Sequence, residues 1–177
     1  VMTNGFAFIE HLSGSSPATP LQAFWETGNQ AGTYYCTGCP FPGDGVYVIN
    51  TSTDTDEFDQ HVIAHEFQHF LEDQVSRTDS PGGSHSLDER LDLRLAFGEG
   101  FADAFSGMVL DDPLYRDSFG SQQQQVSQFD MERGAVTAPT QRGWYNEASL
   151  MSLAWDLYDS NADTYPNSGN TVEIVAL

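Results

Sequence analysis

The sequence predicts an α+β fold, in which a small mixed sheet precedes a largely helical remainder. Two short segments before residue 51, "GTYYC" and "GVYVIN", are rich in Tyr and Val, as strands are. A long amphipathic segment follows, and two further apolar segments with helical spacing lie downstream. The chain of 177 residues suits a single domain over 1–177 with a sizeable core.

The first fifty residues favour loops and strands. An apolar start, "GFAFIEHL", is followed by "SGSSPATP", which has the composition of a loop. The short segment "AFWETG" could be a helix or a strand. A loop rich in Pro and Gly separates "GTYYC" from "GVYVIN", so these two segments are expected to be separate strands.

Helical signals dominate after residue 51. "TSTDTDEF" supplies N-cap candidates, so we expect a helix over residues 56–75. A second helix is expected over residues 87–110, but Gly98 and Gly100 weaken its middle, so it could start late or bend. Residues 111–143 show no clear pattern, and "NEASLMSLAWDLYDS" predicts a third helix. The expected core positions of the first two helices are Phe58, Val62, Phe67, Phe70, Leu71 and Val75, then Leu91, Leu95, Phe101, Phe105 and Met108.

The charge of the chain is strongly negative. There are 26 acidic residues against six basic ones, all of which are Arg, so the net charge is −20. Such a surface repels nucleic acid and anionic membranes, and we exclude binding to the phosphate backbone of a nucleic acid. No apolar run is long enough for a membrane span, and we expect no signal peptide within these residues. We expect a secreted or periplasmic protein. Because the chain begins at Val1 and ends in the strand-like "TVEIVAL", we also expect a fragment of a longer secreted protein.

The two cysteines, Cys36 and Cys39, stand in "YYCTGCPFPG". They could form a redox pair, half of a zinc knuckle, or a disulfide across a small loop. A knuckle needs a second pair of ligands, and a thioredoxin-like motif should open a helix, whereas Pro40, Pro42 and Gly43 follow here. A structural disulfide is therefore favoured, with two free thiols as the alternative.

Residues 61–73 read "HVIAHEFQHFLED", with His65 and His69 four residues apart and Glu66 directly after the first. On a helix, residues four apart share one face, so both imidazoles can bind one zinc ion at about 2.0–2.1 Å. Glu66 lies about 100° further around the helix, where it can take a proton from water and pass it to a leaving amine. The alternative is a helix that carries two unrelated histidines.

A catalytic zinc site needs a third protein ligand and an open fourth position. The third histidine of the extended motif is absent, because Glu72 and Val75 occupy the positions concerned. His61 lies one turn before His65, and His85 lies in a Gly/Ser loop, so neither has the usual downstream position on a facing element. We expect His61 to be a packing or solvated residue, although it could line the site.

The segment "AFGEGFADAF", residues 96–105, offers the third ligand. Glu99 and Asp103 are four apart and share a helix face, so Glu99 would bind the metal and Asp103 would accept the outer N–H of a zinc-bound histidine. The neighbouring Phe and Ala residues predict a buried helix, in which a carboxylate pair would be costly without a cation. A solvated acidic face is the alternative.

"HEFQH" and "GEGFAD" together resemble the metal-binding helices of the gluzincins, zincin metallopeptidases with two histidines and a glutamate on zinc. "GEGFAD" is similar to the second-helix motif of the aminopeptidase-N family and to the corresponding segment of clostridial collagenases, but the exopeptidase motif of aminopeptidase N is absent. The resemblance covers roughly residues 45 to 110 and implies a zincin-like metallopeptidase fold. It also implies three zinc ligands, His65, His69 and Glu99, with Glu66 as general base and Asp103 beside a ligand histidine.

Other cleft features are left open by the sequence. Zincins place an edge strand above the cleft, where a peptide can add as a further strand. "GTYYC" or "GVYVIN" is in the right order for that role, and a core hairpin is the alternative. Peptide hydrolysis also needs a donor to the developing oxyanion. Candidates are Tyr145, Arg142, Tyr115 and Tyr158, while Glu147 could be a helix-start carboxylate.

We therefore predict a zinc-dependent metallopeptidase, in particular an endopeptidase, that binds one Zn²⁺ per chain and hydrolyses a peptide or protein substrate. A zincin-fold binding domain without turnover, a zinc hydrolase of non-peptide substrates, and a redox module using Cys36 and Cys39 are the alternatives. The acidic segments "TSTDTDEFD" and "DSNADTYPNSGN" do not match the EF-hand register; they are expected to be solvated caps, but could hold a stabilising Ca²⁺. The oligomeric state is not determined by the sequence.

Overall fold

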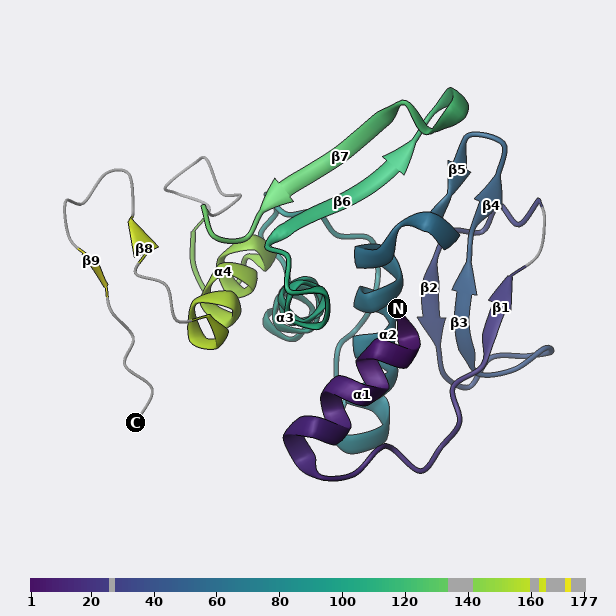
Figure 1. Ribbon diagram of the computed structural model, residues 1–177, viewed down its shortest axis with the longest axis horizontal. Coiled ribbons are helices and arrows are strands. Elements are labelled where there is room, and N and C mark those ends of the chain that lie inside the picture. The colour runs from purple at the N-terminus through teal and green to yellow at the C-terminus, as the bar shows by residue number, and fades with distance from the viewer. Residues whose placement is uncertain (26–27, 134–141, 160–162, 165–170, 173–177) are drawn as a thin grey trace.

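The computed structural model describes residues 1–25, 28–133, 142–159, 163–164 and 171–172 (Figure 1). It is a mixed α+β structure with small sheets. The helices are α1 (Met2–Ser13), α2 (Gln60–Val75), α3 (Leu93–Leu110) and α4 (Glu147–Tyr158), with two 3₁₀ turns, η1 (Asp56–Phe58) and η2 (Ser121–Gln123). The strands are β1 (Ala23–Trp25), β2 (Tyr34–Cys36), β3 (Gly45–Val48), β4 (Asn50–Thr51), β5 (Asp54–Thr55), β6 (Leu114–Phe119), β7 (Gln125–Asp130), β8 (Asp163–Thr164) and β9 (Thr171–Val172).

The first sheet has the strand order β1-β3-β2. β1 runs parallel to β3 and β2 runs antiparallel to it, with Tyr35 opposite Val46. "GTYYC" therefore contains the edge strand β2, on the side of the sheet nearest α2 in Figure 1, whereas "GVYVIN" contains the central strand β3. Of the two segments considered for the edge role, only the first lies at an edge of this sheet.

The second sheet has the order β4-β5-β6-β7 and contains a hairpin that the sequence does not reveal. β6 and β7 pair in register from Leu114 opposite Asp130 to Phe119 opposite Gln125, within the segment that lacked a pattern. Most side chains of β7 are exposed, so no alternation of apolar residues marks it. The cross-strand partners Tyr115 and Phe129 stack with ring centroids 4.5 Å apart.

Helix α1 was also not predicted, and it completes the core around α2. Its Phe6 packs edge-on against Phe67 of α2, at 4.9 Å between ring centroids, and its Phe8 packs against Phe105 of α3. Gly5 permits this approach, because a Cβ at that position would collide with the Phe67 ring. The central cluster of buried residues comprises Phe67, Phe70, Leu71 and Phe105.

Three residues expected to be buried are exposed. Phe58 and Val75, expected on the buried side of the first long helix, are 74% and 70% exposed, because they lie in η1 and at the last residue of α2, beyond the packed turns. Phe97, in the segment expected to be buried, is 56% exposed and stacks on Phe101.

The third helix starts late, at Leu93, where the side chain of Asp92 accepts a hydrogen bond from the backbone N–H of Arg94 as an N-cap. Gly100 does not break the helix. It lies where α3 contacts α4, and a Cβ there would collide with the backbone oxygen of Glu147. Gly100 lowers the intrinsic helix propensity, but it allows α3 and α4 to pack closely, side by side in Figure 1.

Within the described residues, no helix is long and apolar enough to cross a lipid bilayer. The segments "DSNADTYPNSGN" and "TVEIVAL" lie largely outside the described residues; their described parts include the two short paired strands, β8 and β9.

Candidate metal centre

The two histidines of "HEFQH" lie one turn apart on α2 and point at the same place. The Nε2 atoms of His65 and His69 are 3.1 Å apart. Glu99 reaches this place from α3, and its Oε2 lies 3.1 Å from His65 Nε2 and 3.2 Å from His69 Nε2. Four ligands placed tetrahedrally at zinc distances would be separated by about 3.3 Å, so this spacing suits zinc.

The donor set also suits zinc chemically. Two imidazole nitrogens and one carboxylate oxygen are typical zinc donors, and three protein ligands leave a fourth position open. At this centre, the potential ligand atoms that all lie within 4.8 Å of one another come from His65, His69 and Glu99. The structure thus brings together the three residues expected to bind the metal, and they could hold a zinc ion.

Asp103 lies one turn beyond Glu99 on α3 and contacts the outer edge of His65. Its Oδ1 is 2.8 Å from His65 Nδ1, and its side chain is almost completely buried. This contact assigns the proton to Nδ1 and leaves Nε2 free to bind a metal. The tautomer of His65 that zinc requires is therefore set by α3.

The electrostatics of these groups favour positive charge at the centre. Burial lowers the pKa of His65, but its contacts with Asp103 and Glu99 outweigh burial and raise the pKa well above its ordinary value. Burial raises the pKa of Glu99, but His65 and His69 outweigh it and hold the pKa well below the usual range. Burial raises the pKa of Asp103 to about 6, against the lowering effect of His65. A divalent cation would take over the role of the proton here.

Glu66 lies on the side of α2 that faces the first sheet. Its Oε2 accepts a hydrogen bond of 2.7 Å from the backbone N–H of Tyr35, at the centre of the edge strand β2. The structure records no hydrogen bond to its Oε1 within the described residues. The expected general base is thus positioned by the edge strand, with one carboxylate oxygen left for water.

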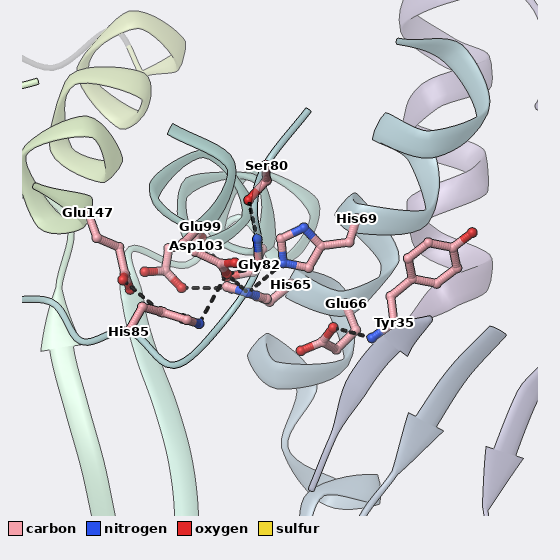
Figure 2. A network of polar contacts seen from close by, with 11 residues as sticks. Tyr35, His65, Glu66, His69, Ser80, Gly82, His85, Glu99, Asp103 and Glu147 are labelled. Atoms are coloured by element: carbon pink, nitrogen blue, oxygen red, sulfur yellow. Dashed lines mark hydrogen bonds and ion pairs between the residues drawn. The ribbon is translucent and has the colours of Figure 1, made fainter. Parts of the chain in front are cut away.

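His85 joins the centre from a loop, although sequence reasoning set it aside as a site residue. Its Nδ1 lies 2.8 Å from Glu147 Oε2, at the first residue of α4, and its Nε2 lies 3.4 Å from Glu99 Oε2. Figure 2 shows Glu147, His85 and Glu99 in a row on the α4 side of the centre, with Glu66 and Tyr35 on the sheet side. The hydrogen bond with Glu147 raises the pKa of His85, against the effect of burial.

The loop that carries His85 is fastened to the start of α4. Asn146, completely buried, caps that helix by accepting from Ser149 N–H, and its Nδ2 donates to the backbone oxygens of Leu87 and Glu89, at 2.7 and 3.2 Å. The backbone N–H of Leu91 donates to Tyr145 O. These contacts link residues about 60 positions apart, which no local sequence pattern encodes.

The candidate oxyanion donors have different positions. Tyr115 is half-buried, with its ring against His61. Burial, and then the charges of Asp103, Asp117 and Glu66, raise its pKa well above the usual value. The ring of Tyr145 lies under the guanidinium of Arg90, at 4.0 Å. Arg142 is exposed, and Tyr158 packs against Trp155 in the apolar region of α4. Tyr115 is thus the candidate whose position is shown to be near the centre.

His61 does not line the centre by any recorded contact. Its Nε2 lies 3.2 Å from the backbone oxygen of Asp112, its ring packs on Tyr115, and burial lowers its pKa. It connects the first turn of α2 to the end of α3, which agrees with the packing role expected for it.

Cys36 and Cys39 form a disulfide with Cα atoms 5.9 Å apart, which confirms the expected pairing. Cys36 is the last residue of β2, and Cys39 lies in the following loop, so neither opens a helix. The disulfide closes the loop next to the edge strand, and Cys36 directly follows Tyr35, whose backbone N–H contacts Glu66.

Comparison with known proteins places the chain in a metallopeptidase context. The family model described as the mycolysin C-terminal domain matches residues 10–174, which includes α2, α3 and every residue of the centre. Searches of curated proteins and of solved structures found no match. The match spans most of the sequence, and the chain belongs to the mycolysin C-terminal domain family.

Proposed function

We propose that this chain is the catalytic domain of a secreted zinc metallopeptidase that cleaves peptide bonds as an endopeptidase, on a zincin-like scaffold. One observation carries the proposal: His65 Nε2, His69 Nε2 and Glu99 Oε2 lie within 3.1–3.2 Å of one another, with Glu66 one residue from the first ligand. The family description names no reaction, so catalysis is an inference from this geometry.

His65, His69 and Glu99 would hold the zinc ion. Bound there, zinc supplies Lewis-acid chemistry by polarising a carbonyl oxygen and increasing the acidity of water. Glu66 accepts the proton of the attacking water on its free oxygen and then delivers it to the leaving amine. The Tyr35 N–H holds the other oxygen of Glu66, and Asp103 holds the His65 ring. These two contacts keep both the base and one ligand in a single orientation.

The edge strand supports a peptide as the substrate. The N–H of Tyr35 points away from β3 and toward the centre, so the outer edge of β2 adjoins Glu66. An extended peptide that adds to this edge brings its backbone past the base. A small non-peptide substrate would not require such an edge, and this observation favours a peptide.

We further propose His85 as a positioning residue. Its Nε2 contacts the same Glu99 oxygen that both ligand histidines contact, but it lies outside the group of atoms close enough to share one ion. His85 is held by Glu147 and would orient the Glu99 carboxylate without occupying the open fourth position.

A secreted location agrees with two features. The disulfide between Cys36 and Cys39 is typical of oxidising compartments, and the net charge of −20 suits a protein in salt-containing water, where screening reduces self-repulsion.

The test combines metal content with peptide hydrolysis. Purified protein should contain about one zinc per chain by mass spectrometry, and His65→Ala and Glu99→Ala should each lose it. A panel of quenched fluorescent peptides should be cleaved at internal bonds, with activity abolished in Glu66→Gln while its zinc content is retained. Full zinc content in Glu99→Ala would refute the ligand assignment.

The alternatives give different results in the same experiment. A binding domain without turnover would retain zinc but cleave no peptide, and Glu66→Gln would change nothing. A hydrolase of other substrates would leave peptides intact but hydrolyse esters or amides in a manner that depends on Glu66. A redox module would exchange the Cys36–Cys39 disulfide under mild reductant and would not need zinc.

A further inference from the structure

Three carboxylates form a second cluster, separate from the His65 centre. Asp54 of β5, Asp56 of η1 and Asp117 of β6 each place an oxygen within 4.8 Å of the other two. Asp54 lies opposite Phe119 in the antiparallel pairing of β5 with β6, so continuing this register puts position 56 opposite position 117. The three side chains meet because of this register, which joins the acidic segment "TSTDTDEFD" to a strand that follows α3.

Buried oxygens in this cluster lack partners. Asp56 is only 7% exposed, and its Oδ1 has no hydrogen-bond partner; Oδ1 of Asp54 is likewise buried without one. The described arginines with recorded ion pairs neutralise other carboxylates, namely Asp79, Asp92, Asp112 and Asp130. Burying a carboxylate is costly unless it is paired, hydrogen-bonded or bound to a metal. The buried Asp56 oxygen without a hydrogen-bond partner is therefore a second observation, besides the clustering of acidic residues, that indicates a cation site.

The protonation of these groups supports the same conclusion. Burial raises the pKa of Asp56 to about 7, against a hydrogen bond from Thr33 and with help from the charges of Asp54 and Asp117. Burial raises the pKa of Asp117 to about 6, and the charges of Asp54 and Asp59 add to this. Without a counter-ion, the cluster therefore holds protons that carboxylates normally lose well below neutral pH.

We propose that Asp54, Asp56 and Asp117 bind a Ca²⁺ ion that ties β6 to the chain immediately before α2. All recognised donors are oxygens, which suits hard cations rather than zinc. Ca²⁺ takes six to eight oxygens at about 2.3–2.6 Å in flexible geometry, so ligand oxygens up to about 5 Å apart can share one ion. Mg²⁺ demands near-octahedral geometry and usually keeps several waters with only one or two carboxylates, so three protein carboxylates suit Ca²⁺ better.

The position of the cluster gives the ion a structural role. Asp59, the N-cap residue of α2, already accepts hydrogen bonds from Ser118 N–H and Oγ, at 3.1 and 2.8 Å. An ion bound by Asp117 and Asp56 would add a second connection between β6 and the start of the helix that carries His65. This role does not depend on peptidase activity.

Thermal unfolding of the whole chain tests the site. Protein is stripped of metals with a chelator, reloaded with one equivalent of zinc, and unfolded across 0–10 mM CaCl₂. NaCl and MgCl₂ at matched ionic strength are the second and third series. If the dissociation constant is about 10⁻⁴–10⁻³ M, 10 mM Ca²⁺ should raise Tm by about 3–11 °C. Asp56→Asn and Asp117→Asn should abolish the increase. Asp111→Asn, which removes the same charge from an exposed position at the end of α3, should keep it.

The control series is needed because a chain with net charge −20 gains stability from any screening salt. An increase of the same size with NaCl or MgCl₂, or one retained in both cluster variants, would overturn the proposal. If Asp56→Asn does not fold, Asp117→Asn together with wild-type Ca²⁺ stoichiometry by calorimetry gives the answer. One Ca²⁺ per chain in the wild type and none in Asp117→Asn supports the site, and any other ratio overturns it.

Discussion

Removal of the Asp103 carboxylate should weaken zinc binding without removing a zinc ligand. In the structure, Asp103 Oδ1 lies 2.8 Å from His65 Nδ1, and Asp103 is only 3% exposed. Removing a group that hydrogen-bonds a metal-bound histidine typically lowers the metal affinity by about 10–100-fold. Asp103→Asn keeps an acceptor for the His65 N–H but loses the charge, so we expect a loss of about tenfold, or about 1.4 kcal/mol. Asp103→Ala leaves the N–H unpaired, so we expect about 100-fold.

The pH of the measurement matters, because zinc and a proton compete for His65. Asp103 and Glu99 raise the pKa of His65, so wild-type protein must release a proton to bind zinc near neutral pH. Asp103→Asn reduces this competition, and the observed loss should therefore be smaller at pH 7 than at pH 9.

The assay is competition for zinc against a chromogenic chelator of known affinity, at both pH values, with circular dichroism to verify folding. Ser106→Ala is the matched control, since Ser106 is buried on the same helix and donates to the backbone oxygen of Asp103 rather than touching His65. Its zinc affinity should equal that of the wild type. A folded Asp103→Ala variant that binds zinc like the wild type at both pH values would refute the assigned role of Asp103.

Three further predictions follow from other contacts. His85→Ala should retain one zinc per chain but lower kcat/KM by about 10–100-fold, and loss of zinc would instead make His85 a ligand. Asn146→Ala removes the helix cap and two donated hydrogen bonds, so it should lower the free energy of unfolding by about 3 kcal/mol, or Tm by about 6–12 °C. Asn146→Ser keeps a cap and should recover about 1 kcal/mol of this loss. Equal Tm values for the two variants would contradict the capping role. Calcium-free protein should lose stability as the pH rises from about 4 to about 7. The folded-state pKa values of Asp56 and Asp117, about 7 and 6, lie above the ordinary value of 3.8, so over this range the unfolded state has lost protons that the folded state still holds. Urea midpoints should show a flatter profile for Asp56→Asn and for wild type with Ca²⁺, and an unchanged slope would count against the assignment.

The local order of the chain determines much of the candidate centre. His65 and His69 share a face because both stand on one helix with the period of 3.6 residues, and Glu99 and Asp103 do so for the same reason. The apolar residues around each pair predict that the two helices are buried, and hence that the four polar groups face each other across a core. Strands β2 and β3 follow from their own Tyr and Val content, whereas β1, β4 and β5 carry no such signal.

Elements without a local pattern required the tertiary structure. β7 is mostly exposed, and α1 is held by contacts such as that of Gly5 with the Phe67 ring, so neither carries a clear signal in its own residues. Gly100 lowers helix propensity locally, yet it is needed where α3 meets the backbone of α4.

The same distinction holds for the polar groups of the metal centre and of the second carboxylate cluster. His85 meets Glu147 and Glu99 only because Asn146 holds the loop onto α4, and Asp117 meets Asp54 and Asp56 only through the register of β5 with β6. The sequence alone determined the pairs of residues whose spacing matches a helical turn, since that geometry is local. Contacts between residues far apart in the chain depend on how whole elements pack and pair, and these required the folded structure.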